Sequence, residues 1–180
     1  MVRDRADAIL ALAEMFRTYG FESASLATIE KHTGLGRGSL YHFFPGGKND
    51  MARAVLDEVG AWFAREVYAP LREDGPPAAR IEAMFTATGA YFRSRHLVCL
   101  FGAMAIGRER ERFGDEIRGY FRDWIDALTV PLEQSGAREA GLLATDVVGG
   151  IQGALVLARA LHDDDLFTRS LDRLQAQVIG

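Results

Sequence analysis

The chain of 180 residues has little cysteine, no long apolar run and no pattern of an export signal. Its single cysteine, Cys99, excludes an internal disulfide, so we expect a protein of the reducing cytoplasm. The longest stretch of low charge, residues 147–158, is short and rich in glycine, which predicts no membrane-spanning segment and no membrane partner. The N-terminal residues MVRDRADAIL carry acidic groups and a short apolar run, unlike a signal peptide.

Residues that would indicate catalysis or metal binding are also scarce. The four histidines, His32, His42, His96 and His162, are dispersed and lack the spacing of metal ligands. The three aspartates at 163–165 are predicted to form a solvated loop and a helix cap. No phosphate-binding loop, nucleophile elbow or carboxylate pair stands out. We therefore expect no enzyme activity, no metal and no cofactor.

Charge is unevenly distributed along the chain. Lys and Arg number 21 and Asp and Glu 25, a net charge of −4, which does not by itself indicate a nucleic-acid partner. Residues 1–50 are neutral, because their basic side chains (Arg3, Arg5, Arg17, Lys31, Arg37, Lys48) are as many as their acidic ones (Asp4, Asp7, Glu14, Glu22, Glu30, Asp50). The rest of the chain carries the net charge, which favours a polyanion partner for the N-terminal part.

The hydrophobic pattern is helical throughout and never alternates with the period of a strand. It predicts an all-α protein of about nine helices: 4–19, 26–33, 37–43, 48–72, 77–95, 98–108, 114–134, 138–161 and 165–178. The first three are short, and the Pro-Gly-Gly turn at 45–47 ends them. We expect a three-helix DNA-binding domain over 1–47, and a helical bundle over 48–180 for ligand binding and dimerisation.

Residues 34–50, GLGRGSLYHFFPGGKND, alternate apolar with polar or basic side chains. Two short helices joined by a tight turn with glycine are typical of a helix-turn-helix, whose second helix enters the major groove. Leu26, Ile29, Leu35, Leu40, Phe43 and Phe44 are predicted to hold the motif together. The residues predicted to face DNA are Arg37, Gly38, Ser39, Tyr41, His42 and Lys48. Arginine reads guanine, glycine permits close approach, and the other groups bind phosphate.

These residues resemble the DNA-binding domain of TetR-type transcriptional regulators. The match, within residues 8–51, comprises Phe16, Gly20, Phe21, Ser25, Leu26, Ile29, Gly34, Leu35, Gly38, Ser39, Leu40, Tyr41, Phe43, Phe44 and Lys48. The PGGK turn and the later GALVLARAL resemble the LmrA/YxaF-like branch. The resemblance implies a homodimeric repressor that a small molecule releases from a palindromic DNA operator. It also adds Ser25 and Thr28 to the DNA contacts.

Two positions depart from the family pattern. Gly36 stands where the family usually has a Ser or Thr that caps the second helix of the motif. Ala27 stands where many members carry an arginine that reads a base. We therefore expect Arg37 to do much of the base reading.

The bundle is expected to contain an apolar effector pocket with few polar groups. The candidate lining residues are Trp62, Phe63, Met84, Phe85, Thr88, Phe92, Cys99, Met104, Phe121, Trp124, Ile125 and Gln152. Many Phe and Met with few buried charges favour a small hydrophobic or aromatic effector. Each of these residues also fits a plain core position.

Glycine is frequent in the predicted helix 138–161, although each one costs roughly 1 kcal/mol relative to alanine. Close helix–helix approach would compensate for this cost. The resemblance implies that the last two helices pack against a second copy of the chain. The predicted interface residues are Gly149, Gly153, Leu155, Leu161, Phe167, Leu171, Leu174 and Val178.

Two other functions stay open. In a helical protein-interaction module without DNA binding, Arg37, Tyr41 and Lys48 would be ordinary surface groups. In a thiol-based sensor of oxidants or electrophiles, the cations at 93–96 would activate Cys99. The effector, the operator sequence and the choice between repression and activation are not encoded in a readable pattern.

Overall fold

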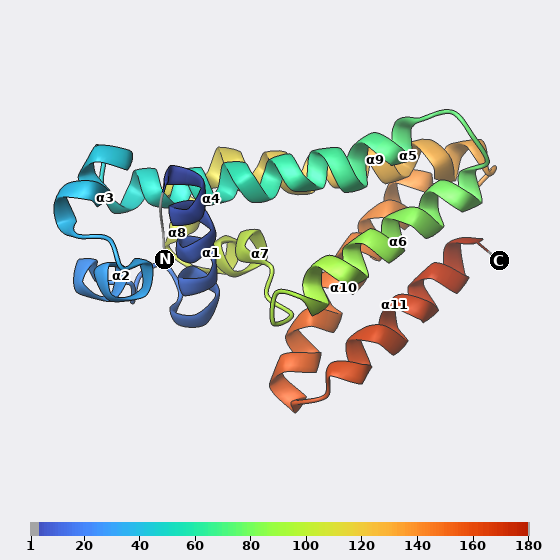
Figure 1. Cartoon of the computed structure of the whole chain (residues 1–180). Helices are drawn as coiled ribbons and strands as arrows, with labels where there is room; N and C mark the ends of the chain where they lie inside the picture. Colours follow the sequence, from blue (N-terminus) through green and yellow to red (C-terminus); the bar gives the residue numbers. More distant parts are fainter. Residues whose placement is uncertain (1–3, 180) are drawn as a thin grey trace. The chain divides into compact units, whose positions relative to one another are not determined.

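The computed structural model describes residues 4–179, so the ends of the two predicted domains, 1–3 and 180, lie outside the described residues. The described residues form helices and no strand, which confirms the all-α prediction (Figure 1). The elements are α1 (Arg5–Tyr19), α2 (Leu26–Thr33), α3 (Arg37–Phe43), α4 (Lys48–Phe63), the π-helical η1 (Ala64–Tyr68), α5 (Ala69–Arg72), α6 (Pro77–Arg93), α7 (Leu100–Ile106), α8 (Glu109–Arg112), α9 (Gly114–Gln134), α10 (Ala140–Leu161) and α11 (Asp164–Ile179).

The chain folds into two compact units. The first contains the residues up to Ala61 together with Leu100–Glu116, and the second contains Trp62–Cys99 and the residues from Ile117 onward. Both α4 and α9 therefore begin in the first unit and continue into the second. The predicted functional boundary between residues 47 and 48 stays a prediction.

The predicted helices agree with the observed ones except at two places. The helix predicted over 48–72 is three elements, α4, η1 and α5, because Pro70 lacks the N–H that would continue the α-helical ladder. The π-helical turn before Pro70 takes up this disruption, with Ala69 N–H bonded to Ala64 C=O. The second difference is α8, a single turn where the pattern predicted only a break.

The first unit is built on the buried face of α1. Ala8, Leu12 and Phe16 lie in the core of this unit. The Asp4 carboxylate caps the N-terminus of the helix by accepting a hydrogen bond from Asp7 N–H at 2.9 Å. Gly20 ends the helix with a positive φ of 75°, which glycine adopts at little cost.

The second unit has an aromatic core centred on Phe63. Its ring centroid lies 5.1 Å from Trp62, 4.9 Å from Tyr91, 5.0 Å from Tyr120 and 5.3 Å from Trp124. Edge and tilted contacts of this kind stabilise a core beyond simple area burial. The last two helices, α10 and α11, pack as an antiparallel pair in this unit (Figure 1).

Gly150 explains part of the glycine content of α10. A Cβ built at this position would lie 2.8 Å from Leu174 Cδ2 on α11. The close helix approach inferred from the glycines is therefore present at Gly150, within one chain. At Gly149 and Gly153 a Cβ would meet no described atom within 4 Å, so their side of α10 is open.

By length and composition alone, α10 is apolar enough to cross a membrane. The expectation that no segment would be long and apolar enough for this was therefore wrong. The apolar stretch extends on both sides of residues 147–158, because only Asp146 and Arg159 interrupt it. A core helix of a soluble protein passes the same test, and one face of α10 is buried in the second unit.

Candidate nucleic-acid interface

The N-terminus of α2 is capped by Ser25, as predicted. Ser25 Oγ accepts a hydrogen bond from Thr28 N–H at 3.1 Å and lies 2.8 Å from Thr28 Oγ1. The two hydroxyl groups thus hold each other at the start of the helix, where the helix dipole favours an anion. Ser25 is exposed and Thr28 half-buried, so both can be reached by a phosphate.

A tight turn joins α2 to α3. Gly34 adopts the left-handed conformation with a φ of 68°, and its N–H closes the last turn of α2. Thr33 Oγ1 donates to Ile29 C=O at 2.8 Å and accepts from Leu35 N–H at 3.2 Å. Ile29 and Leu40 are fully buried and fix the two helices together. The predicted helix-turn-helix geometry is present.

α3 presents a surface of polar and small residues. The exposed positions on it are Arg37, Gly38, Ser39, Tyr41 and His42. A Cβ at Gly38 would meet no described atom within 4 Å, so the backbone there is open to a partner. Gly36, the N-cap residue of α3, has no side chain to cap the helix, as the sequence indicated.

The residues beneath α3 are less uniformly buried than predicted. Phe44 is buried with Leu40, but Leu26, Leu35 and Phe43 are only half-buried. A motif of two short helices is thin, so only one row of apolar positions can be fully enclosed.

Glu30 on α2 pairs with Arg37 on α3, a contact that the sequence analysis missed. Arg37 Nε lies 3.5 Å from Glu30 Oε1, and the two side chains are 67% and 30% exposed. Pairing through Nε leaves both terminal nitrogens of the guanidinium for a base edge. No local spacing rule indicates this pair, because its residues lie on different helices.

His32 links α1 to α2. Its Nδ1 lies 2.8 Å from Thr28 C=O, which can only accept, so Nδ1 carries the proton. In the neutral ring, Nε2 then accepts from the Tyr19 hydroxyl at 3.1 Å. This histidine has a structural role at the edge of the motif.

Lys48 differs from the other predicted DNA contacts. Its Nζ donates to Glu22 C=O at 3.2 Å and lies 4.4 Å from the centroid of the Phe21 ring. The side chain is half-buried, and burial lowers the pKa of its ammonium group. The ammonium is therefore engaged by the α1–α2 turn.

In the second unit, several of the predicted effector residues come together. Trp62, Phe63, Phe92 and Trp124 belong to the aromatic core, whereas Met104 belongs to the first unit and is not part of this group. Thr88 Oγ1 lies 3.8 Å from Met84 Sδ on α6, and Phe85 is buried on the same helix. Phe121, Ile125 and Gln152 are half-buried.

Three buried N–H donors in this unit lack a protein acceptor among the described residues. They are Arg80 Nε, Trp124 Nε1 and Gln152 Nε2. Buried polar groups are almost always hydrogen-bonded, so each of these N–H groups has the capacity to bind water or a ligand.

Two tyrosines and the cysteine share the aromatic core. The Tyr68 hydroxyl donates to Tyr120 C=O at 3.0 Å, and burial raises the pKa of both phenols well above its usual range. Cys99 is 8% exposed and shares a hydrogen bond with the Tyr120 hydroxyl, which adds to the raised pKa of Tyr120.

The predicted dimer residues divide into two groups. Leu155, Phe167 and Leu171 are buried within the second unit, where they support the α10–α11 pair from beneath. Leu161 is 63% exposed, Gly149 and Gly153 are exposed, and Leu174 and Val178 are half-buried. The sequence analysis missed three other exposed apolar residues of α10, which are Leu142, Val156 and Leu157.

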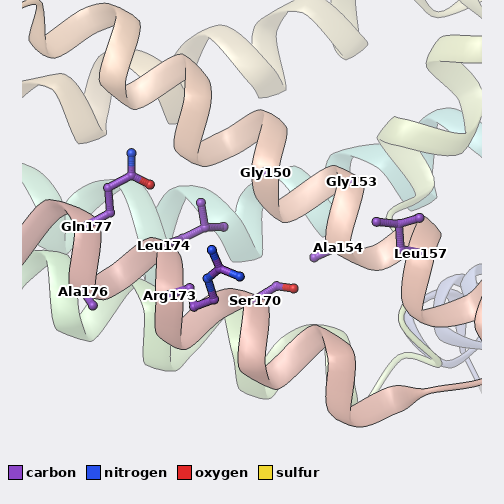
Figure 2. A pocket seen from close by; sticks show the side chains of 9 residues that line it. All are labelled: Gly150, Gly153, Ala154, Leu157, Ser170, Arg173, Leu174, Ala176 and Gln177. Carbon is purple, nitrogen blue, oxygen red and sulfur yellow. The ribbon is translucent and has the colours of Figure 1, made fainter.

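One of these exposed residues, Leu157, lines a surface groove between α10 and α11. Its volume is about 800 Å³, and Figure 2 shows small residues of α10 facing side chains of α11 across it. The lining residues are Gly150, Gly153, Ala154, Leu157, Ser170, Arg173, Leu174, Ala176 and Gln177. Positions 142, 149, 153 and 156 recur at helical spacing, a signal that could have identified this face from sequence.

A capped α2, a tight turn and an exposed α3, carried by an all-helical chain, define a helix-turn-helix protein. The family of bacterial regulatory proteins described as the tetR family matches residues 9–55. The family described as the C-terminal domain of LmrA/YxaF-like transcriptional regulators matches residues 77–172. The chain belongs to the TetR family, in its LmrA/YxaF-like branch, and is a DNA-binding transcriptional regulator.

Similar proteins cover nearly the whole chain. The uncharacterized HTH-type transcriptional regulator YxaF of Bacillus subtilis (strain 168) is 25% identical over 167 residues, which are 89% of this chain and 87% of that protein. The HTH-type transcriptional regulator LmrA of the same strain is 24% identical over 162 residues, 86% of each chain.

Solved structures show the same fold. A TetR transcriptional regulator from Legionella pneumophila superimposes with a TM-score of 0.85 at 18% identity, over 99% of this chain and 98% of that one. A cysteine mutant of the TetR-family regulator CifR, complexed with 26-bp operator DNA, gives a TM-score of 0.78 at 20% identity, over 98% and 97%.

Proposed function

We propose that this regulator is a cytoplasmic homodimeric repressor, and that a small hydrophobic or aromatic effector releases it from a palindromic operator. The observation that carries the proposal is α3, whose exposed residues form a continuous surface while Leu40 anchors the helix from beneath. The structural neighbour CifR is complexed with double-strand operator DNA, which supports a similar use of the motif here.

Each exposed residue has a distinct task in this proposal. Arg37 reads a guanine through its terminal nitrogens, and Gly38 lets the backbone approach the groove. Ser39, Tyr41 and His42 hydrogen-bond to base edges or phosphates along α3. Ser25 and Thr28 bind a phosphate at the N-terminus of α2, where the helix dipole adds to the attraction.

Dimerisation uses the open side of α10 and the groove beside α11. Val156 and Leu157 are 65% and 52% exposed, and apolar surface of this kind is covered in an assembly. A two-fold axis through this face pairs two copies of the motif. Paired recognition helices read half-sites about 34–36 Å apart or a multiple of that spacing, hence a palindrome.

The effector binds in the second unit beside the aromatic core. The indole N–H of Trp124 and the amide N–H of Gln152 supply hydrogen bonds that fix its orientation. Because α4 and α9 run from this unit into the first, a change in either helix alters the DNA-binding unit. The coupling cannot exceed the difference in effector affinity between the two states.

Binding to DNA from the chain's own genomic region tests the proposal. Fluorescence anisotropy with the wild-type protein should show tight binding that weakens steeply with salt, because phosphate contacts release counterions. Arg37→Ala and Tyr41→Ala should each weaken binding at least about tenfold while the protein stays dimeric. A protein-interaction module would instead show no salt-dependent preference for any genomic site.

The burial of Cys99 favours packing over sensing. A sensor thiol must be reachable, whereas this one lies 8% exposed against Tyr120. Treatment with iodoacetamide under native conditions should leave operator affinity unchanged. A loss of affinity that Cys99→Ser prevents would restore the thiol-sensor alternative.

A further inference from the structure

The turn between α1 and α2 decides where the N-terminus of α2 lies. It contains Phe21 and Ala24, both buried, and leads directly into the capping residue Ser25. Phe21 packs against Phe16 of α1 with 5.7 Å between ring centroids. Any group that holds this turn therefore sets the position of the Ser25–Thr28 cap.

Two residues from the middle of the chain, at 112 and 113, pack against this turn. Phe113, between α8 and α9, is fully buried, and its ring meets Phe21 edge-on with 5.4 Å between centroids. Arg112 lies over the same Phe21 ring at 5.7 Å and pairs with the Glu22 carboxylate at 4.0 Å. Arg112 Nη1 also donates to Asn49 Oδ1 in the first turn of α4 at 3.4 Å.

A second cation holds the turn from α4. Lys48 Nζ lies 4.4 Å from the Phe21 centroid and donates to Glu22 C=O at 3.2 Å. Burial lowers the pKa of Lys48, with Glu22 opposing this effect and Arg112 adding to it. Lys48 therefore keeps its ammonium in a partly desolvated position, where the Glu22 carbonyl and the face of the Phe21 ring are its partners.

The far side of Phe113 is also fixed within the first unit. Arg53 of α4 lies over the Phe113 ring at 5.6 Å and pairs with Glu116 of α9 at 3.1 Å. Three cationic side chains from α4 and α8 thus lie over the rings of the Phe21–Phe113 aromatic pair, and Glu116 of α9 pairs with one of them. From Glu116, α9 continues into the second unit.

We propose that Lys48 and Arg112 are positioning residues that clamp the Phe21–Glu22 turn, and that Lys48 is not a phosphate contact. Through Phe113, this clamp connects the N-terminus of α2 to α9, and so to the unit proposed to bind the effector. The inference rests on the proposed function for its consequence on DNA binding. The clamp itself is a property of the first unit.

The salt dependence of operator binding separates the two roles of Lys48. Lys48→Met retains the apolar stem and removes the charge, and Arg112→Gln removes the cation on the other side of the turn. We expect each variant to weaken operator binding about tenfold while the slope of log Kd against log salt stays at the wild-type value. Loss of a phosphate contact would instead lower the slope by about 0.9 for each contact. The double variant should lose less than the product of the single losses, because both act on one turn.

Arg110→Gln is the matched control, since Arg110 is exposed on the same short helix. It should change affinity by less than about twofold. Hydrogen exchange gives a readout that needs no DNA. Amides of residues 21–28 should exchange faster in Lys48→Met and Arg112→Gln, while amides of α10 keep wild-type rates.

A lower salt slope in Lys48→Met would overturn the inference, as would wild-type exchange over 21–28 in Arg112→Gln. If the wild-type protein binds no operator at all, the proposed function fails, and the exchange rates still decide whether the clamp exists.

Discussion

The Arg37 side chain, which is proposed to read the operator, is already paired with Glu30 in the absence of DNA. Glu30 carries a negative charge within 3.5 Å of it, on the surface that must meet phosphates. An exposed pair of this kind contributes at most about 1 kcal/mol to stability, so stability does not account for it. We infer that Glu30 orients Arg37 and penalises DNA whose bases do not engage the guanidinium.

Glu30→Gln should therefore reduce discrimination. Removing a negative charge from the interface should tighten binding to non-operator DNA about threefold, because one repulsion with the phosphates is lost. Operator affinity should change less, so the ratio of the two affinities falls. Competition anisotropy with operator and scrambled duplexes measures this ratio.

Glu66→Gln is the control for this experiment. Glu66 pairs with Arg65 at 2.7 Å on η1 in the other unit, so the substitution makes the same charge change away from the motif. An equal effect from both variants would mean that net charge alone is responsible.

The residues of the motif that could be predicted are those with a local signature. Ser25, Gly34 and Gly36 each occupy a helix end, where conformation and capping chemistry follow from the neighbouring sequence. The roles of Glu30 and Lys48 could not be predicted in this way. Their partners, Arg37 and the Phe21–Glu22 turn, lie on other elements, and only the tertiary fold brings them together.

Among the elements, the glycine-rich α10 packs against α11 on one side and leaves another side open, where a second copy of the chain is proposed to bind. Gly150 faces Leu174 of α11 within the chain, whereas Gly149 and Gly153 face open space. The glycine content of this segment predicted a close helix approach, but it could not tell an intrachain contact from one with a second copy.

Gly153→Leu should break the dimer and leave the protomer folded. The new side chain has room within the chain but would occupy the surface proposed to meet the partner. Analytical ultracentrifugation should show a monomer with unchanged helical circular dichroism. Gly153→Ala should instead remain dimeric and gain up to roughly 1 kcal/mol from helix propensity. A Gly153→Leu dimer of wild-type affinity would place the interface elsewhere.

The buried Arg80 of α6 connects this helix to α5 and α9 by hydrogen bonds. Its guanidinium donates to Leu71 C=O at 3.0 Å, to Glu73 C=O at 2.8 Å, and to the Gln134 side-chain oxygen. It ties the C-terminal ends of α5 and α9 to α6, a role for which the sequence offers no pattern.

Arg80→Ala should lower the free energy of unfolding by about 2–4 kcal/mol, because buried carbonyl groups lose a charged donor. Urea denaturation measures the loss. Arg65→Ala, which removes an exposed arginine of η1, should change stability by less than about 0.5 kcal/mol. A similar small loss in Arg80→Ala would show that water replaces the guanidinium.

For the whole molecule, the helix order was predictable but the grouping of helices was not. Periodicity and breakers located the helices, because these signals are local. Residues 100–116 join the first unit although they are remote from it in sequence. One contact that joins them to it is that of Phe113 with Phe21, which a hydrophobic pattern marks only as two buried rings.

The buried phenols make the stability of the whole protein sensitive to alkaline pH. Burial raises the pKa of Tyr68 and of Tyr120 above the usual value near 10, and Cys99 adds to both shifts. In the unfolded chain both phenols lose their protons near pH 10, whereas in the folded protein they remain neutral. The folded state therefore binds more protons above pH 10, and stability falls as pH rises.

Unfolding in urea at a series of pH values tests this linkage. Below pH 10 neither phenol contributes a slope, and above it each should lower the unfolding free energy by up to about 1.4 kcal/mol per pH unit. Tyr68→Phe should remove one of these contributions, so its stability should decline less steeply than that of the wild type above pH 10. At pH 7 the same variant should be the less stable of the two, because the hydrogen bond to Tyr120 C=O is lost. Parallel curves for the two proteins across the alkaline range would mean that Tyr68 ionises in the folded state as readily as in the unfolded chain.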